Sequence, residues 1–190
     1  MFIQLAIYEQ MIRVIGGLYK GKVLKRVPAS EVRPLPGKLR ESLFNILHTR
    51  IKGSIFLDGF AGTGSCGIEA LSRGAERVVF VENFWPAVKV IKINLARCEA
   101  EDKARVIRKE FNRAVIQLSQ ENLKFDLIFL DPPYKLLEER NPLKVLKKRG
   151  VLKEGGMIIL RKNRRTKFEG RYFQLKRTVT MGDDTLCFYE

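Results

Sequence analysis

From Ser54 onward, short apolar runs alternate along the chain with longer stretches in which apolar residues recur every three or four positions. Strands buried on both faces are typically continuous apolar runs, whereas a spacing of three and four residues marks one face of a helix. The alternation therefore predicts an α/β fold built around a mostly parallel sheet. The expected strands are Ser54–Asp58, Arg77–Glu82, Arg105–Ile107, Phe125–Leu130 and Met157–Leu160. The expected helices are Gly67–Arg73, Trp85–Arg97, Phe111–Leu118 and Leu136–Arg149.

The two ends of the chain depart from this alternation. Near the start, Arg13–Lys25 alternates apolar and basic residues around glycines, which predicts a small β-hairpin, and Lys38–Leu47 then has the spacing of an amphipathic helix. Near the end, Tyr172–Thr180 and Leu186–Tyr189 are strand-like and are joined by the turn-prone segment Gly182-Asp183-Asp184. We expect them to form a closing hairpin at the edge of the sheet.

The length and composition favour one domain with a small addition. The chain has 190 residues, of which 45% are hydrophobic, and this is enough to bury a core. No apolar run approaches the roughly 18–20 residues that span a bilayer, and the first ten residues lack the features of a secretory signal. We expect residues 1–35 to be an N-terminal extension and hairpin appendage, and residues 36–190 to be the main domain. The recognisable pattern begins at Met11, so one interpretation of residues 1–10 is an extension from an upstream start.

The cysteine and histidine content bears on compartment and metal chemistry. Three cysteines, which are odd in number and unclustered, fit neither a disulfide framework nor a zinc site, and a single histidine adds no metal-binding pair. We therefore expect a reduced, cytoplasmic protein that holds no metal.

The charge is strongly basic and unevenly distributed. The formal net charge is +15, and a nearly neutral centre is flanked by basic segments at residues 1–50 and 144–177. Clustered lysine and arginine attract phosphate backbones, so a nucleic-acid partner is indicated, although charge alone does not separate RNA from DNA. The candidate phosphate contacts in the first segment are Arg13, Lys20, Lys22, Arg33, Lys38 and Arg40.

The first segment that indicates chemistry is the glycine-rich run Asp58–Gly64, which lies between an expected strand and an expected helix. Glycines let the backbone turn sharply and let a ligand approach, and a helix N-terminus offers free N–H groups. The spacing Gly62-x-Gly64-x-x-Gly67 also fits the dinucleotide fingerprint, which is a weak signal by itself. Glu82 ends the next strand, where an acidic side chain accepts ribose hydroxyls. A tight turn without a ligand is the alternative interpretation.

The second segment is Asp131-Pro132-Pro133-Tyr134, which follows an apolar strand. Ligands of open α/β sheets bind at the carboxyl ends of strands. The prolines remove two N–H donors, so a carboxylate and an exposed carbonyl are left to accept hydrogen bonds from an exocyclic NH₂ group. An adjacent tyrosine ring can stack on the base that carries the amine. The alternative is a loop in which the prolines only end the strand.

Several segments together resemble one known family. They are Arg13-Val14-Ile15-Gly16-Gly17, Arg33-Pro34, Leu39–Asn45, Gly67–Ala75, Asp131–Tyr134 and Gly182-Asp183-x-Thr185-Leu186. The chain resembles the RsmD family, which methylates the N2 amine of a guanine in small-subunit ribosomal RNA. The resemblance implies a Rossmann-like class I methyltransferase fold with a mostly parallel sheet and one antiparallel strand near the C-terminus. It also implies S-adenosylmethionine as the cofactor and ribosomal RNA, free or within a small subunit or an assembly intermediate, as the partner.

The resemblance also implies roles for particular residues. The catalytic group is expected to be Asp131, Pro132, Pro133 and Tyr134. The cofactor is expected to contact Asp58, Phe60, Ala61, Gly62, Gly64, Glu82, Asn83, Glu110 and Phe111. The chain departs from the family at Leu35-Pro36-Gly37, where Thr-Thr/Ser-Asp is common, at Glu110, where Asn or Asp is usual, and at two further positions. Gly59 stands where cysteine is common, which we expect to matter little, and Arg161 stands where an acidic residue is common, so no role is assigned to it.

Two other functions remain open at this point. A DNA adenine-N6 methyltransferase could use the same Asp131–Tyr134 chemistry on an adenine amine. An NAD-dependent oxidoreductase could use the glycine pattern and Glu82, but this reading leaves Asp131–Tyr134 and the basic flanks unexplained.

Overall fold

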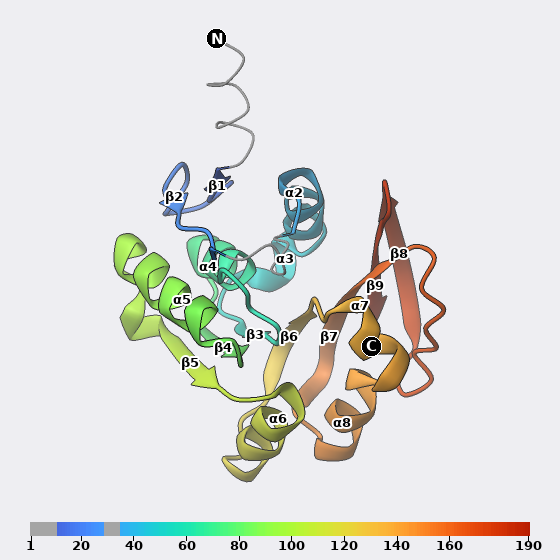
Figure 1. The fold of residues 1–190 in the computed structure, drawn as a ribbon. Coiled ribbons are helices and arrows are strands. Elements are labelled where there is room, and N and C mark those ends of the chain that lie inside the picture. Colours follow the sequence, from blue (N-terminus) through green and yellow to red (C-terminus); the bar gives the residue numbers. More distant parts are fainter. Residues whose placement is uncertain (1–10, 29–34) are drawn as a thin grey trace.

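A seven-stranded sheet forms the centre of the computed structural model (Figure 1), which describes residues 11–28 and 35–190. Its strands are β3 (Ile55–Asp58), β4 (Arg77–Glu82), β5 (Ala104–Arg108), β6 (Phe125–Leu130), β7 (Leu152–Asn163), β8 (Leu175–Met181) and β9 (Asp184–Tyr189). They lie in the order β5-β4-β3-β6-β7-β9-β8. The first five of these strands run parallel, and β9 pairs antiparallel with both β7 and β8. The predicted sheet and closing hairpin are confirmed.

Helices cover both faces of the sheet, as Figure 1 shows. One face carries α2 (Gly37–Ile46), α3 (His48–Ile51), α4 (Ser65–Ser72) and α5 (Trp85–Cys98), and the other carries α6 (Phe111–Gln120), α7 (Tyr134–Glu139) and α8 (Pro142–Arg149). Side chains alternate along each strand, so Leu127 and Phe129 join the first core and Ile128 and Leu130 join the second. No helix within the described ranges is long and apolar enough to cross a membrane.

The structure corrects several predicted elements. The single helix expected over Leu136–Arg149 is two helices, because Pro142 has no N–H to continue a helix and instead opens α8. The side chain of Asn141 caps this new start by accepting a hydrogen bond from the Leu143 amide at 3.0 Å. Strand β7 extends well beyond the expected Met157–Leu160, and the short α3 and a 3-10 turn at Glu101–Lys103 were not predicted.

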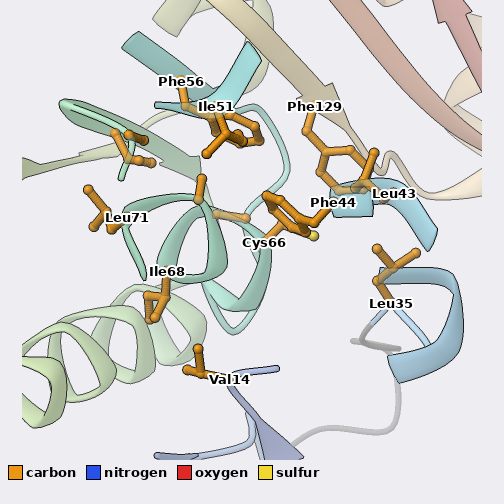
Figure 2. Packing of buried hydrophobic residues seen from close by; sticks show 14 of the residues in the cluster. Val14, Leu35, Leu43, Phe44, Ile51, Phe56, Cys66, Ile68, Leu71 and Phe129 are labelled. Carbon is orange, nitrogen blue, oxygen red and sulfur yellow. The ribbon is translucent and has the colours of Figure 1, made fainter. Parts of the chain in front are cut away.

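The predicted N-terminal hairpin is present as β1 (Ile12–Arg13) paired antiparallel with β2 (Val23–Leu24). It shares one hydrophobic core with helix α4, and Figure 2 shows Val14 of the hairpin facing this helix. The fully buried Glu69 of α4 accepts hydrogen bonds from the amides of Ile15 at 2.8 Å and Gly16 at 2.9 Å. These contacts attach the hairpin firmly to the main domain. The domain boundary at residue 35 stays a prediction, since the residues just before it lie outside the described part.

Gly17 shows how closely the hairpin approaches α4. Its φ is +78°, and a Cβ there would lie 1.8 Å from the Ser72 carbonyl oxygen. The hydroxyl of Ser72 also accepts a hydrogen bond from the Tyr19 amide at 2.9 Å. Only glycine combines the left-handed backbone with this close contact.

Arg40 of α2 belongs to this attachment and not to a nucleic-acid surface. Its Nη2 donates to the Arg13 carbonyl at 2.6 Å, and its Nε lies 3.9 Å from the Glu69 carboxylate. The residue is only 3% exposed. The prediction that Arg40 contacts RNA is therefore wrong, because its guanidinium is used inside the protein.

Candidate active site

A cavity of about 580 Å³ lies at the carboxyl ends of β3, β4, β6 and β7. The chain winds from β3 to β5 on one side of the sheet and from β6 to β7 on the other, so the cavity sits where the strand order reverses. Open α/β sheets bind ligands at this point, and the volume is that of a small-molecule site. Most of the predicted site residues line it, namely Asp58, Phe60, Ala61, Gly62, Glu82, Asn83, Asp131, Pro132 and Pro133.

The glycine-rich loop has the conformation that the sequence predicts. Gly62 and Gly64 have φ values of 53° and 77°, which are in the left-handed region that glycine adopts most easily. Gly64 precedes α4, so the free amides at the start of this helix point toward the loop. The loop thus brings backbone without a side chain to the edge of the cavity at Gly62.

Asp58 anchors the base of this loop. Its Oδ2 accepts a hydrogen bond from the Gly67 amide at 2.9 Å, and the residue is 1% exposed. Burial raises the pKa of Asp58 to about 7; the Gly67 hydrogen bond opposes this shift, and the nearby carboxylates of Asp131 and Glu82 add to it. Asp58 is therefore a largely structural carboxyl whose charge changes near neutral pH.

Glu82 closes the loop from the end of β4. Its Oε2 accepts a hydrogen bond from the Gly62 amide, and its Oε1 accepts from the amides of Asn83 and Phe84, all at 2.9 Å. A carboxylate offers about four acceptor sites, so three bonds leave it limited further capacity. The side chain holds the loop together in addition to its predicted role toward ribose hydroxyls.

The predicted cofactor contacts Phe60, Glu110 and Phe111 divide into two groups. Phe60 lines the cavity, and its ring stacks on that of the buried Phe111 with the centroids 4.8 Å apart. Phe111 and Glu110 are not among the described residues that line the cavity. Glu110 instead caps α6 by accepting a hydrogen bond from the Arg113 amide at 3.2 Å. Gly59 also matters more than expected, because a Cβ there would lie 2.6 Å from Leu130 and 2.8 Å from Phe111.

Asp131 and an unpredicted arginine form the opposite wall of the cavity. Asp131 follows β6, and its Oδ2 accepts a hydrogen bond from Nη1 of Arg161 at 2.7 Å. Arg161 comes from β7, is 2% exposed, and also donates from Nε to Oδ1 of Asp184 at 3.1 Å. Burial raises the pKa of Asp131, the Arg161 charge opposes this shift, and Asp184 adds to it. Tyr134 begins α7, and the prediction about its ring lies outside the described side chains.

Other lining residues were not among the predicted site residues: Leu35, Thr63, Ser65, Cys66, Phe84 and Phe129. Phe84 and Trp85 are not buried against the sheet, since they are 41% and 42% exposed. The Trp85 ring instead lies near two cations, with the Arg108 guanidinium carbon at 4.9 Å and Lys89 Nζ at 5.2 Å from its centroid. Cys66 is a packing residue, because burial raises the pKa of its thiol well above the ordinary value.

Asn94 of α5 connects the glycine loop to the N-terminal hairpin. It is fully buried, and its Nδ2 donates to the Thr63 carbonyl at 2.9 Å and to the Lys25 carbonyl at 3.0 Å. Its Oδ1 accepts from the Lys25 amide at 2.6 Å. One amide side chain thus satisfies backbone groups from both segments.

The predicted RNA contacts differ in how free their side chains are. Lys20 and Lys38 are exposed. Lys22 donates to the Arg97 carbonyl at 2.8 Å and lies 3.7 Å from Glu99, so it is partly used within the protein. Arg13 donates to the Gly21 carbonyl at 3.2 Å. Arg33 lies outside the described residues. Among those that are described, no three His, Cys, Asp or Glu side chains gather to hold a metal.

The fold and the site together define a class of protein. A mostly parallel sheet with this glycine loop, an acid ending the adjacent strand and Asp131-Pro132 across the cavity define a Rossmann-like methyltransferase. The fold is shared with an RNA methyltransferase from Salinibacter ruber in complex with S-adenosyl-L-homocysteine, at a TM-score of 0.65 and 17% identity over 83% of this chain and 92% of that one. The predicted fold class is confirmed.

Closer relatives define the family. Residues 12–190 match the family model described as conserved hypothetical protein 95. The ribosomal RNA small subunit methyltransferase D of Escherichia coli K12 is 35% identical over 149 residues, which is 77% of this chain and 72% of that protein. A hypothetical protein from Thermus thermophilus, whose structure is solved, has a TM-score of 0.82 and 31% identity, covering 94% of this chain and 99% of that one. The chain belongs to the RsmD family, as its motifs predict, and the oxidoreductase alternative has no support.

Proposed function

We propose that this enzyme transfers a methyl group from S-adenosylmethionine to the exocyclic N2 amine of a guanine in small-subunit ribosomal RNA. The observation that carries this proposal is the position of Asp131 and Pro132, which line the same cavity as the glycine loop. Membership in the RsmD family supports ribosomal RNA as the substrate.

The residues around the cavity fit the cofactor. Gly62 presents backbone without a side chain to the cavity, as close approach of the methionine part requires, and Gly64 gives the loop its left-handed turn before α4. The carboxylate of Glu82 lies where it can accept from ribose hydroxyls, and Phe84 offers an exposed ring for the adenine. When bound, the cofactor supplies an electrophilic methyl group on its sulfonium.

Asp131 and Pro132 bind and orient the target amine. The amine of guanine is a weak nucleophile, because its lone pair is delocalised into the ring. Hydrogen bonds from its N–H groups to the Asp131 carboxylate and the Pro132 carbonyl hold the nitrogen in position and stabilise the positive charge that develops there. Pro133 fixes the backbone, and Tyr134 is assigned to stack on the extruded base.

The basic segments supply the attraction for a polyanion. We assign phosphate contacts to the exposed Lys20 and Lys38 first, and to Arg13, Lys22 and Arg33 with them. The substrate in this proposal is free ribosomal RNA, the small subunit or an assembly intermediate. An enzyme with such a substrate works in the cytoplasm, without a metal or a membrane partner.

Mapping of modified nucleotides tests the function directly. Ribosomal RNA from cells that lack this gene should lose one N2-methylguanosine, and a plasmid-borne wild-type copy should restore it. The purified protein is then given S-adenosylmethionine with free 16S RNA, small subunits, or duplex DNA. Unchanged N2-methylguanosine in the deletion strain would contradict the proposal, and methylation of adenine N6 in the DNA would favour the DNA alternative.

A further inference from the structure

The ion network behind Asp131 gives Arg161 a role that the family resemblance does not. We propose that Arg161 is a positioning residue that keeps Asp131 ionised and directs one of its oxygens toward the target amine. This inference rests on the proposed function, because it concerns the same carboxylate.

The geometry separates the two oxygens of Asp131. Oδ2 receives the hydrogen bond from Nη1 of Arg161 at 2.7 Å, and Arg161 is the one donor to this carboxylate within the described part of the chain. The side chain of Asp131 is 17% exposed and lines the cavity, whereas that of Arg161 is only 2% exposed. The guanidinium therefore lies behind the carboxylate, and its fixed fork holds Oδ2 so that Oδ1 is left for the substrate.

Arg161 is itself held by a second carboxylate. Its Nε donates to Oδ1 of Asp184 at 3.1 Å, and Nη2 lies 3.0 Å from the same oxygen. Asp184 is the first residue of β9, directly after the Gly182-Asp183 turn, and β9 pairs antiparallel with β7. Asp184 occupies the variable position of the Gly182-Asp183-x-Thr185-Leu186 motif, and there it orients Arg161.

The charges around Asp131 explain why a cation is needed there. Two acidic side chains interact with Asp131: Asp58 at the end of β3 and Asp184 at the start of β9. The neutral thiol of Cys66, from α4, also lies near Asp131. Burial and these acids favour the protonated form of Asp131, and Arg161 opposes them. A protonated Asp131 would turn one of its acceptors into an O–H donor and would lose the negative charge that strengthens a hydrogen bond from the amine. Arg161 thereby preserves the acceptor on which the reaction depends.

The test compares two substitutions that act on the same network in opposite directions. The rate of single-turnover methyl transfer should fall as pH falls and Asp131 takes up a proton. This fall in rate is the acid limb of the pH–rate profile. Arg161→Gln removes the positive charge that favours ionised Asp131, so the acid limb should move to higher pH. On the limb, the rate should be at least about tenfold below wild type, since an opposite charge at this distance changes ionisation by that factor or more. Asp184→Asn removes an unfavourable charge and leaves Arg161 on Asp131, so its limb should move to lower pH.

Further variants separate this role from a purely structural one. Arg161→Lys keeps the charge and should restore the position of the acid limb, with a lower plateau because the fork geometry is lost. Arg161→Gln leaves the carboxylates of Asp131 and Asp184 buried without their cation, which can destabilise the fold. The double variant with Asp184→Asn removes one of these two charges. The acid limb of the double variant should still lie at higher pH than the acid limb of Asp184→Asn alone. Parallel shifts in the same direction for both single variants, or lower rates with no shift in either, would overturn the proposal.

A measurement without substrate keeps the inference distinct from the proposed function. The titration of the Asp131 carboxyl is followed by carbon NMR in the free protein, with Asp131→Asn used to assign the signal. Arg161→Gln should raise the pKa of Asp131 and Asp184→Asn should lower it. If neither variant moves this titration, Arg161 does not control Asp131, whatever the enzyme methylates. If the titration moves as expected but guanine N2 is not methylated, the proposed function alone fails.

Discussion

The two walls of the cavity are built in different ways. The wall toward the cofactor is mainly backbone: Gly62 and Gly64 shape it, and Asp58 and Glu82 accept hydrogen bonds from amides of the same short region. The wall toward the target is made of charged side chains from strands that are distant in sequence, with Arg161 lying 30 residues from Asp131 and 23 from Asp184. The first wall follows from local conformation, and the second exists only after β7 and β9 have paired.

The largest expected effect lies on the target wall. Asp131→Asn keeps the size of the side chain but replaces one acceptor oxygen with an NH₂ donor. Methyl transfer should slow by roughly 10²–10³, which is the cost of losing one preorganised partner in a transition state. The measurement is single-turnover transfer with saturating cofactor and RNA. Affinity for S-adenosylmethionine should be retained, and a rate within about threefold of wild type would show that Asp131 is structural.

Glu82→Ala tests the cofactor wall in the same way. The change removes the predicted ribose contact and also the acceptor for the amides of Gly62, Asn83 and Phe84. Affinity for S-adenosylmethionine should weaken by on the order of 1–3 kcal/mol, the cost of unmade hydrogen bonds. Calorimetry measures it, and Asp131→Asn is the matched control that should bind normally. Equal affinity of Glu82→Ala and wild type would remove Glu82 from the cofactor site.

The pH dependence of stability examines the base of the cofactor wall. The pKa of Asp58 is about 7 in the folded protein, above its ordinary value of 3.8. Between these values the folded state retains a proton that the unfolded chain has released, so Asp58 makes the free energy of unfolding decrease as pH rises through this window. Asp58→Asn should remove a slope of up to about 1.4 kcal/mol per pH unit.

Denaturant unfolding at several pH values between about 4 and 8 measures this slope. The exposed Asp183, changed to Asn, is the matched control and should leave the slope as it is in wild type. A slope for Asp58→Asn that equals that of wild type would mean that Asp58 is ionised throughout the range.

The smallest effect is expected outside both walls, on the basic hairpin. Lys20→Ala should reduce the slope of log affinity for RNA against log salt by up to about 0.9, the share of one phosphate contact. The exposed Lys124 lies just before the start of β6, at the end of the sheet away from the cavity, so Lys124→Ala is a matched control. Filter binding at several salt concentrations measures both slopes. Equal slopes for the two variants would exclude Lys20 as a docking residue.

The sequence predicts the cofactor wall better than the target wall for physical reasons. The apolar runs of β4 and β6 end at the predicted residues, and glycines mark the loop, since these signals are local. The link between Arg161 and Asp131 depends on which strands are neighbours, and a spacing along the chain does not contain this. The only available signal was the place of Arg161 at the carboxyl end of a predicted strand.

Arg40 and the region after Asp131 show two other limits. A basic residue in a basic segment predicts a surface contact, yet Arg40 is buried against the hairpin carbonyl of Arg13. Arg40 is buried because α2 packs on α4, and the distribution of charged residues along the sequence does not reveal this packing. In contrast, the break between α7 and α8 could have been predicted from the sequence, because Asn141-Pro142 is a common start of a helix.

The hairpin that Glu69, Ser72 and Asn94 hold has a consequence for the order in which the protein can fold during synthesis. The hairpin is translated before α4 and α5, and the partners of its amides lie 53 to 69 residues later in the chain. Until α4 and α5 have been made, a hairpin with two-residue strands has little to stabilise it. The hairpin thus completes its contacts only after the segment that contains the cofactor loop has been translated.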